Sequence, residues 1–423
     1  MDFLKELEWR GMLHQMTPGI EELLAEGSQI AYIGFDPTAK SLTIGNYVQI
    51  MLLTLWQRAG HRPIVLMGGA TGRIGDPSGK DQERQLKTFE ELDANLASQV
   101  EQMKSLLDFE GENGAILVNN LDFYSEMSAI DFLRNVGKTL TINYMLAKDS
   151  VKNRIETGMS FTEFSYQLLQ GYDFAKLFEL HGCRVQMGGS DQWGNITGGI
   201  EFVRRQQGGK VFAVTTPLLT KADGSKFGKS EAGNIWLSAE YTSPFEFYQF
   251  WLRAADADLE KFIKYFSLRP RVEMEDMIAQ IETDPNGVKR ELADELTARV
   301  HGEIGLKTAQ GVTNLLYGRS ATREDLMALD APTLLSLDGK IDTFRVPASV
   351  FKGEESLIDF LAETTKAVAS KSEARRAIQN NAVSINKEKV TSVEATLTPN
   401  QLLHNKFVLL ENGRKRKYLV IAE

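Results

Sequence analysis

The sequence predicts a protein of the α/β class, with a parallel β-sheet in its first half, a helical middle and a small α+β unit at its C-terminus. Three observations lead to this prediction. Short apolar runs alternate with amphipathic stretches in the first half, which is typical of a parallel sheet covered by helices on both faces. Helical periodicity without strand signals begins at about Ser243. From residue 353 on, helix and hairpin signals follow one another closely.

Five apolar runs of the first half are expected to be buried strands, and four amphipathic stretches between them are expected to be helices. The strands are expected at residues 29–35, 63–67, 115–118, 184–187 and 211–214, and the helices at 44–59, 89–107, 162–169 and 192–206. In a sheet of this kind, ligands bind beyond the carboxyl ends of the strands. The residues that follow these strands are therefore the candidate site.

In the second half of the chain, the sequence predicts a run of helices followed by a compact C-terminal unit. Helices are expected at 244–253, 259–267, 271–280 and 288–303, and an irregular linker is expected at 331–352. Ser370 and Glu373 form a capping box that predicts a helix start. A strand at 382–385 and a hairpin of 407–410 with 418–421 complete the unit.

The composition indicates a globular protein with more than one core. The chain has 423 residues, of which 42% are hydrophobic and 25% charged, which excludes intrinsic disorder as the main state. The single Cys183 excludes a disulfide framework or a thiolate zinc site within one chain. No apolar stretch approaches ~18 residues, and the first residues lack the apolar core of a signal peptide. We therefore expect a cytoplasmic protein without a membrane segment.

The charge is distributed unevenly along the chain. The formal net charge is −9, yet residues 366–423 carry 11 Lys and Arg against 5 Asp and Glu. That segment is therefore at +6, and residues 1–365 are at −15. Such an asymmetry is typical of an appendage that binds a polyanion. A solvated surface that happens to be basic is the alternative.

A first polar cluster spans residues 32–48, YIGFDPTAKSLTIGNYV. A predicted strand ends near Phe35, Asp36-Pro37 turns the chain, and a helix begins near Ile44. The exposed N–H groups and the dipole at a helix N-terminus favour an anion such as phosphate. Gly45 would let a ribose or a flat ring approach the backbone. An ordinary capped helix start explains the same residues.

A second cluster, GGATGRIGDPSGKDQER at 68–84, places four glycines in eight positions after a strand. Its spacing fits neither a Walker A motif nor a dinucleotide fingerprint. Asp76 could hold an ammonium group, and Lys80 and Arg84 could hold phosphate or carboxylate. A solvated glycine loop with scattered charges is the alternative.

The third cluster lies on a predicted helix, in SYQLLQGYD at 165–173. Tyr166, Gln170 and Asp173 are spaced so that they share one helix face. Such a face suits the wall of a pocket for a small polar ligand. A stripe turned to the surface is the alternative.

The fourth cluster pairs GGSDQWGN at 188–195 with KFGKS at 226–230. Asp191 at the helix start could accept a hydrogen bond from a ribose hydroxyl. Lys226 and Lys229 flank Gly228, and two lysines on a glycine loop can close over a polyphosphate. A lone K-x-x-K spacing is common by chance.

Taken together, these clusters resemble the bacterial tyrosyl-tRNA synthetases, a family of class I aminoacyl-tRNA synthetases. The matching segments are YIGFDPTA, GDPSGK, YQLLQGYD, GGSDQWGNI and KFGKS, followed by a C-terminal unit that looks like an S4-type RNA-binding module. The resemblance covers nearly the whole chain. It implies a Rossmann-like catalytic domain at 1–242, an α-helical domain at 243–330, a linker at 331–352 and an S4-like RNA-binding domain at 353–423.

The resemblance also implies an activity and its partners. The chain would activate L-tyrosine with ATP and transfer the tyrosyl group to the 3′ end of tRNA(Tyr). It would act as a homodimer in the cytoplasm, with Mg²⁺ brought by ATP and without a protein-bound metal. None of the clusters offers an obvious general base, and this reaction needs none: positioning and charge stabilisation at the phosphates are sufficient.

The resemblance assigns three groups of site residues. Those expected to act in catalysis at the phosphates are Lys226, Lys229, Thr38, Thr43 and Asn46. Those expected to bind tyrosine are Tyr32, Gly34, Asp36, Asp76, Tyr166, Gln170, Asp173 and Gln192. Those expected to bind ATP are Gly45, Asp191, Lys80 and Arg84, together with Lys226 and Lys229.

One departure from the family pattern concerns its HIGH motif. Thr43 and Asn46 stand where the family has histidines, so neither residue can carry a positive charge. We infer that phosphate stabilisation depends more on Lys226 and Lys229. A tryptophanyl-tRNA synthetase is a rival prediction, but an indole offers no hydroxyl to Asp173. A non-catalytic RNA-binding relative is a second rival, and the retained lysines and tyrosine pocket argue against it.

Overall fold

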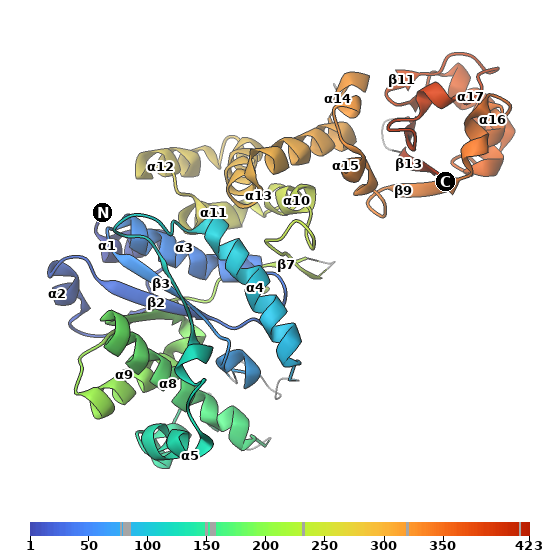
Figure 1. The fold of residues 1–423 in the computed structure, drawn as a ribbon. Coiled ribbons are helices and arrows are strands. Elements are labelled where there is room, and N and C mark those ends of the chain that lie inside the picture. Colours follow the sequence, from blue (N-terminus) through green and yellow to red (C-terminus); the bar gives the residue numbers. More distant parts are fainter. Residues whose placement is uncertain are drawn as a thin grey trace. The chain divides into compact units, whose positions relative to one another are not determined.

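The computed structural model describes residues 1–76, 78, 86–148, 151–152, 158–230, 233–318, 321–413 and 416–423 (Figure 1). These residues form two compact units. Unit 1 comprises residues 1–242 and 249–300, and unit 2 comprises residues 243–248 and 301–423. The division differs from the four segments expected from the sequence, because residues 249–300 pack with the first 242 residues.

Unit 1 is built on a six-stranded sheet with the order β1-β6-β5-β2-β3-β4. The strands are β1 (Gln15–Met16), β2 (Ile30–Phe35), β3 (Arg62–Met67), β4 (Ile116–Asn119), β5 (Val185–Gly189) and β6 (Phe212–Thr216). Strands β2 to β6 pair in parallel, and β1 joins β6 antiparallel. The predicted parallel sheet is confirmed, and each of its five expected strands is present.

Helices cover both faces of this sheet (Figure 1). The long ones are α3 (Ile44–Arg58), α4 (Phe89–Leu106), α8 (Phe161–His181) and α9 (Trp193–Gln207); shorter ones are α1 (Phe3–Arg10), α2 (Ile20–Ala25), α5 (Ala129–Asp131) and α6 (Ile142–Leu146). Helix α8 runs twelve residues beyond the expected end at 169. A Cβ at Gly171 would lie 2.9 Å from the Phe202 ring, so this glycine lets α8 pack closely on α9 rather than ending the helix.

The order of the strands places a topological switch between β2 and β5. From β2 the chain proceeds to β3 and β4 on one side, and from β5 it proceeds to β6 on the other. Strands β2 and β5 are paired through Ala31 with Val185 and Tyr32 with Gln186. Connections that leave a parallel sheet in opposite directions open a crevice at the carboxyl ends of the two strands.

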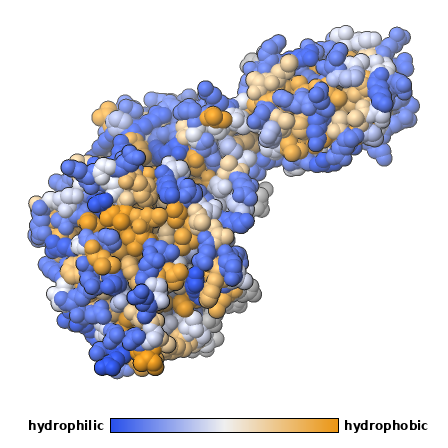
Figure 2. Space-filling view, viewed as in Figure 1, coloured by the Kyte–Doolittle hydropathy of each residue, from blue (hydrophilic) through white to orange (hydrophobic). Residues whose placement is uncertain are grey.

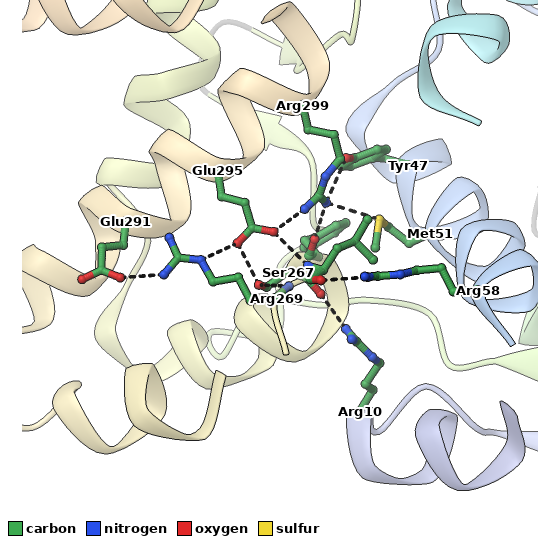
Figure 3. Close-up of polar contacts among 11 residues, drawn as sticks. Arg10, Tyr47, Met51, Arg58, Ser267, Arg269, Glu291, Glu295 and Arg299 are labelled. Atoms are coloured by element: carbon green, nitrogen blue, oxygen red, sulfur yellow. Dashed lines mark hydrogen bonds and ion pairs between the residues drawn. The ribbon is translucent and has the colours of Figure 1, made fainter. Parts of the chain in front are cut away.

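Residues 249–300 contribute α11 (Asp256–Phe266), α12 (Arg271–Gln280) and the first part of α13 (Pro285–Tyr317), which is kinked at Gly302. Three arginines donate to carbonyl groups at and just beyond the C-terminal end of α11 (Figure 3). Arg10 of α1 lies 2.6 Å from the Lys264 oxygen, Arg58 of α3 lies 2.7 Å from the Leu268 oxygen, and Arg299 lies 2.6 Å from the Phe266 oxygen. These carbonyls have no partner within the helix, so the arginines satisfy them and complement the helix dipole.

Two carboxylates complete this arginine cluster (Figure 3). Glu295 pairs with Arg299 and Arg269, and it also accepts from the Leu268 backbone N–H at 2.8 Å. Glu291 pairs with Arg269 at 2.8 Å. Because Arg58 belongs to α3, the cluster ties α11 and α13 to the helix that follows β2.

Unit 2 contains a five-stranded sheet with the order β11-β10-β12-β13-β9. Its strands are β9 (Asp342–Val346), β10 (Val383–Ile385), β11 (Glu388–Lys389), β12 (Phe407–Asn412) and β13 (Arg416–Ala422), and α17 (Lys371–Gln379) packs on them. The predicted hairpin is β12 with β13, which are antiparallel. The prediction of a purely irregular linker at 331–352 was wrong. This segment contains α15 (Ala331–Leu335) and β9, which pairs in parallel with β13. Strand β9 ends at Val346, directly before Pro347, so the proline does not interrupt the pairing.

Two lysines of the basic C-terminal segment are turned inward. Lys387 and Lys417 pair with Glu411 at 2.9 and 3.1 Å, and both donate to the Leu315 carbonyl at the end of α13. Their side chains are 8% and 11% exposed, so they serve packing rather than a polyanion. Among the described residues of the segment, the exposed cations are Lys366, Lys371, Arg375, Arg376, Lys389, Lys406 and Arg416, of which Lys371 pairs with Asp359 and Glu363. No helix among the described residues is long and apolar enough to cross a membrane.

The arginine cluster leads to a first prediction. Arg299→Ala removes the donor to the Phe266 carbonyl and one partner of Glu295, so unit 1 should lose about 2–4 kcal/mol of unfolding free energy. Urea unfolding followed by tryptophan fluorescence measures this loss, because all 5 tryptophans lie in unit 1. Arg204→Ala is the control, since Arg204 is 63% exposed and pairs only with Glu201 of its own helix; it should cost less than about 1 kcal/mol. Equal losses in the two variants would contradict the proposed support of α11.

Candidate active site

A cleft of about 340 Å³ opens at the carboxyl ends of β2 and β5, at the switch point of the sheet. Twelve of the residues predicted for the site line it. They are Tyr32, Gly34, Asp36, Thr38, Gly45, Asn46, Asp76, Tyr166, Gln170, Asp173, Asp191 and Gln192. Segments that are far apart in the sequence thus meet in one cavity, whose size suits a small polar ligand.

The deep end of the cleft is built around Asp173 of α8. Its carboxylate is 1% exposed; one oxygen accepts from the Asn120 amide at 2.8 Å, and the other lies 2.7 Å from the Tyr124 hydroxyl. Burial raises the pKa of Asp173 to about 7, although both hydrogen bonds act in the opposite direction. Tyr32 of β2 is also buried here, with its ring edge-on to Phe174, and its hydroxyl has no hydrogen-bond partner among the described residues.

A chain of hydrogen bonds runs from Asp173 along the wall of the cleft. Asn120 also donates to the Thr71 hydroxyl at 3.0 Å, and Thr71 donates to Asp36 at 2.7 Å. The second oxygen of Asp36 accepts from the Tyr166 hydroxyl at 3.1 Å. Burial, together with the nearby Asp36, raises the pKa of Tyr166 well above its usual range, so its hydroxyl stays a neutral donor.

A second carboxylate, Asp76, follows η1 (Thr71–Arg73) on the way out of the deep pocket. Asp76 accepts from the Gln192 amide at 2.8 Å and from the Ser78 backbone N–H at 2.9 Å. The Gln170 side-chain oxygen is buried on the cleft wall without a partner among the described residues. A carboxylate and an amide oxygen are acceptors, so this part of the cleft suits a cationic group.

The outer part of the cleft lies against the N-terminus of α3. Thr43 caps this helix. Its hydroxyl donates to the Asn46 side-chain oxygen at 2.7 Å, and the Asn46 backbone N–H donates to the Thr43 hydroxyl oxygen. Asn46 lines the cleft and Thr43 does not. Because the Asn46 oxygen is occupied by Thr43, its amide NH₂ is the group that it can offer to a ligand.

The KFGKS segment is held by its phenylalanine. Lys226 and Lys229 are exposed and do not line the cleft, whereas Phe227 between them is buried. The Phe227 ring packs against aromatic rings of α10 (Pro244–Leu252) and α11, with centroids 5.2–6.1 Å apart: Phe250, Trp251, Phe262 and Phe266. Phe266 in turn stacks on Tyr47 of α3, at 5.7 Å and an interplanar angle of 9°.

The same segment contacts the N-terminus of α3 directly. Gly228 has φ +84° and lies so close to Ile44 that a Cβ would approach the Ile44 side chain to 2.7 Å. Ile235 links the two segments through its backbone, since its N–H donates to Gly228 at 3.0 Å and its carbonyl accepts from Ile44 at 2.9 Å. The loop with the two lysines and the helix N-terminus beside the cleft are therefore fastened to each other.

Two predicted site residues, Lys80 and Arg84, lie outside the described residues. Several cleft residues were missed by the sequence analysis, among them Gln49, Thr71, Asn120 and Gln186, as was Tyr124, which contacts Asp173 beside the cleft. Asn120 follows β4 directly, so the rule that selected the other clusters could have found it. Nothing in the sequence around Tyr124 points to Asp173. Within the described part of the chain, no three His, Cys, Asp or Glu side chains gather as a metal site.

Family models match both parts of the chain. The model of class I tRNA synthetases (W and Y) matches residues 25–318, which include every described residue of the cleft. The model of the tyrosine–tRNA ligase SYY-like C-terminal domain matches residues 342–421.

Relatives are similar to this chain over its full length. The tyrosine–tRNA ligase of Bacteroides fragilis (strain ATCC 25285) is 48% identical over 431 residues, covering 100% of both chains. That of Cytophaga hutchinsonii is 50% identical over 424 residues, covering 99% of each. Among solved structures, a C-terminally truncated mitochondrial tyrosyl-tRNA synthetase of Aspergillus nidulans aligns with a TM-score of 0.67 and 31% identity, over 74% of this chain and 94% of that one. The chain belongs to the tyrosine–tRNA ligases, the class I aminoacyl-tRNA synthetases that activate L-tyrosine with ATP and transfer it to tRNA.

Proposed function

We propose that the cleft of unit 1 is the site of tyrosine activation, with the phenol in the deep pocket and the ammonium group at its exit. One observation supports this most strongly. Tyr32 Oη and the side-chain oxygens of Gln49, Gln170 and Gln186 are buried polar atoms without partners among the described residues, and all four residues line this cleft. Buried polar atoms of this kind are costly unless a ligand pairs with them.

The phenol of the substrate would lie between Tyr32 and Asp173. A phenylalanine side chain in the same pocket would leave the buried Tyr32 hydroxyl without a partner and would offer no hydroxyl to Asp173, which costs free energy that tyrosine binding does not. An indole would reach the pocket without a hydroxyl for Asp173. The ammonium group would lie at Asp76, with Gln170 as a further acceptor and Gln192 holding Asp76 in place.

ATP would occupy the outer cleft, with its phosphates near the N-terminus of α3. The tyrosine carboxylate attacks the α-phosphorus, the bond to the pyrophosphate oxygen breaks, and the negative charge passes to the leaving pyrophosphate. Lys226 and Lys229 would neutralise that charge, together with Mg²⁺ brought by ATP. Asp191 would accept from a ribose hydroxyl, and Gly45 and Thr38 would line the path to the phosphates. Lys80 and Arg84 would stand near the pyrophosphate.

The tRNA would be held in part by unit 2, through the exposed cations of its C-terminal segment. Arg375 and Arg376 on α17, Lys389 on β11 and Arg416 on β13 have exposed side chains that can contact phosphates. Lys387 and Lys417 are excluded from this role by their pairing with Glu411. Such contacts make tRNA binding sensitive to salt, because each one releases counterions.

The enzyme would act as a homodimer in the cytoplasm. Exposed apolar side chains of unit 1 support a second copy as the partner: Leu133 of η3 (Phe132–Gly137) is 52% exposed and Phe161 of α8 is 70% exposed. Both line one apolar hollow, together with Tyr124, Met127 and Phe132. Figure 2 shows that apolar residues gather over a broad area of this unit.

The amino-acid site is tested by ATP–pyrophosphate exchange without tRNA. Exchange should depend on tyrosine and fail with tryptophan or phenylalanine. Asp76→Asn removes the charge that holds the ammonium group, so the KM for tyrosine should rise about 30- to 1000-fold with little change in the KM for ATP. Asp93→Asn is the control, because Asp93 is an exposed partner of Arg73; it should behave as the wild type. Absence of exchange with every amino acid would refute the proposed activation site.

The aromatic anchor of the KFGKS segment gives a further prediction. Phe227→Ala removes the ring that fixes the loop, so kcat of exchange should fall about tenfold or more while the KM for tyrosine stays near its wild-type value. Phe227→Leu is the matched variant, because it keeps an apolar side chain in the aromatic cluster and should retain most of the rate. A parallel rise in the KM for tyrosine in Phe227→Ala would mean that the ring supports the whole cleft instead.

The dimer surface is tested by sedimentation velocity. The wild type should sediment as a dimer, and the double variant Leu133→Glu, Phe161→Glu should sediment as a monomer, because two carboxylates cannot be buried there without partners. Val272→Glu introduces the same charge at a side chain of unit 1 that is 68% exposed, and it should leave the dimer intact. Dimers in the double variant would exclude this surface.

A further inference from the structure

The Tyr124 hydroxyl lies between two acceptors but has one proton to donate. Its oxygen is 2.7 Å from the Asp173 carboxylate and 2.9 Å from the carbonyl oxygen of Leu169 in α8. When Asp173 is ionised, the two acceptors compete for that proton. When Asp173 is protonated, its carboxyl donates to the Tyr124 oxygen and Tyr124 donates to the Leu169 carbonyl, which also accepts its helical N–H, so that both contacts of the Tyr124 oxygen are hydrogen bonds at once.

The remaining contacts of Asp173 do not relieve this competition. The Asn120 amide donates one hydrogen to the other Asp173 oxygen and one to Thr71. Thr71 uses its own hydrogen for Asp36. Both hydrogens of the amide and the hydrogen of Thr71 are therefore committed, and a proton on Asp173 is the donor that the Tyr124 contacts lack.

The surroundings of Asp173 favour the neutral carboxyl. Among the described residues, the ionisable groups that act on it are a carboxylate and phenols: Tyr32 of β2, Asp36 just after β2, Tyr124 just after η2 (Asn120–Phe123), and Tyr166 and Tyr172 of α8. Burial is the main cause that raises the pKa of Asp173 to about 7; Asp36 acts in the same direction, and the hydrogen bonds from Asn120 and Tyr124 act in the opposite one. None of the groups named here carries a positive charge that would favour the carboxylate.

We propose that Tyr124 is a specificity-determining residue that acts through Asp173, and that tyrosine binding expels one proton from this pair. In the empty site, Asp173 donates to Tyr124 and Tyr124 donates to Leu169. When tyrosine enters, the Asp173 proton leaves to solvent through the cleft. The Tyr124 hydroxyl then donates to the Asp173 carboxylate. The substrate phenol also donates to that carboxylate, and Tyr32 donates to the phenol oxygen. This inference rests on the tyrosine site proposed above.

The exchange of donors explains why Tyr124 bears on specificity. Tyrosine brings a hydroxyl that compensates for the lost proton, whereas phenylalanine brings none and leaves Asp173 protonated. Discrimination between the two amino acids should therefore increase as the pH rises through 7, and it should fall at lower pH. Discrimination rises with pH because, in this site, the phenol donates to the ionised Asp173 carboxylate.

The proton count is measured by calorimetry of tyrosine binding in buffers of different ionisation enthalpy. Because burial raises the pKa of the free site to about 7, the wild-type enzyme should release most of one proton per site below pH 7 and progressively less above it. Below pH 6.5 the Kd for tyrosine should rise about tenfold per pH unit. Absence of proton release in an enzyme that still catalyses tyrosine-dependent exchange would overturn the inference and leave the activity intact. Absence of both would instead overturn the proposed site.

The role of Tyr124 is tested with a matched pair of variants. Tyr124→Phe keeps the ring and removes one donor to the carboxylate, so at pH 7.5 the Kd for tyrosine should rise about tenfold and more protons should be released than by the wild type, with kcat changed less than about threefold. Tyr172→Phe removes a hydroxyl from the ring that packs on Tyr124 at 5.5 Å, and it should match the wild type. A Tyr124→Phe enzyme with unchanged Kd and proton release would show that Tyr124 only packs.

Discussion

The pairing of β2 with β5 is the constraint on which the cleft depends. These strands are separated by about 150 residues of chain, and their parallel register sets Tyr32 beside Gln186. The connections after them leave in opposite directions, so no helix crosses the carboxyl ends of this pair. Asp36 after β2 and Asp191 after β5 consequently reach one cavity. Every other polar group of the site is positioned relative to this edge.

Helix α3 connects the cleft to the loop that carries Lys226 and Lys229. Its N-terminus borders the cleft, its Ile44 packs against Gly228, and its Tyr47 stacks on Phe266, which also holds Phe227. The C-terminal residue of α3, Arg58, binds the Leu268 carbonyl just beyond α11. One helix therefore contacts the outer part of the cleft, the KFGKS segment and the helices that support that segment. A change in any of these contacts alters the position of the others.

The sequence could predict the elements but not all of their contacts. Continuous apolar runs identified the strands, because strands of a parallel sheet are buried on both faces. The short β9 was missed because its stability comes from pairing with β13, more than 70 residues away. Asp173 was identified by helix spacing, yet its partners Asn120 and Tyr124 come from η2 and its C-cap, and Thr71 of η1 reaches it through Asn120; no local pattern in the sequence records that these segments meet. Likewise, the charges of Lys387 and Lys417 were visible in the sequence, but their burial against Glu411 was not.

The resemblance assigns Thr43 and Asn46 to the places of the two HIGH histidines, and the cap of α3 shows what these two residues do in the fold. Thr43 and Asn46 hydrogen-bond to each other, so the helix start is capped without a ligand, and the helix N-terminus offers only the partial charge of the dipole. A histidine can add a full charge at this place, whereas an amide cannot. Under the function proposed above, the charge that develops on pyrophosphate would be met by groups outside α3. Lys226 and Lys229 would be such groups, and the phenylalanine between them is the residue that the aromatic cluster holds. The loop that would supply the cations is thus firmly attached beside the helix that supplies none.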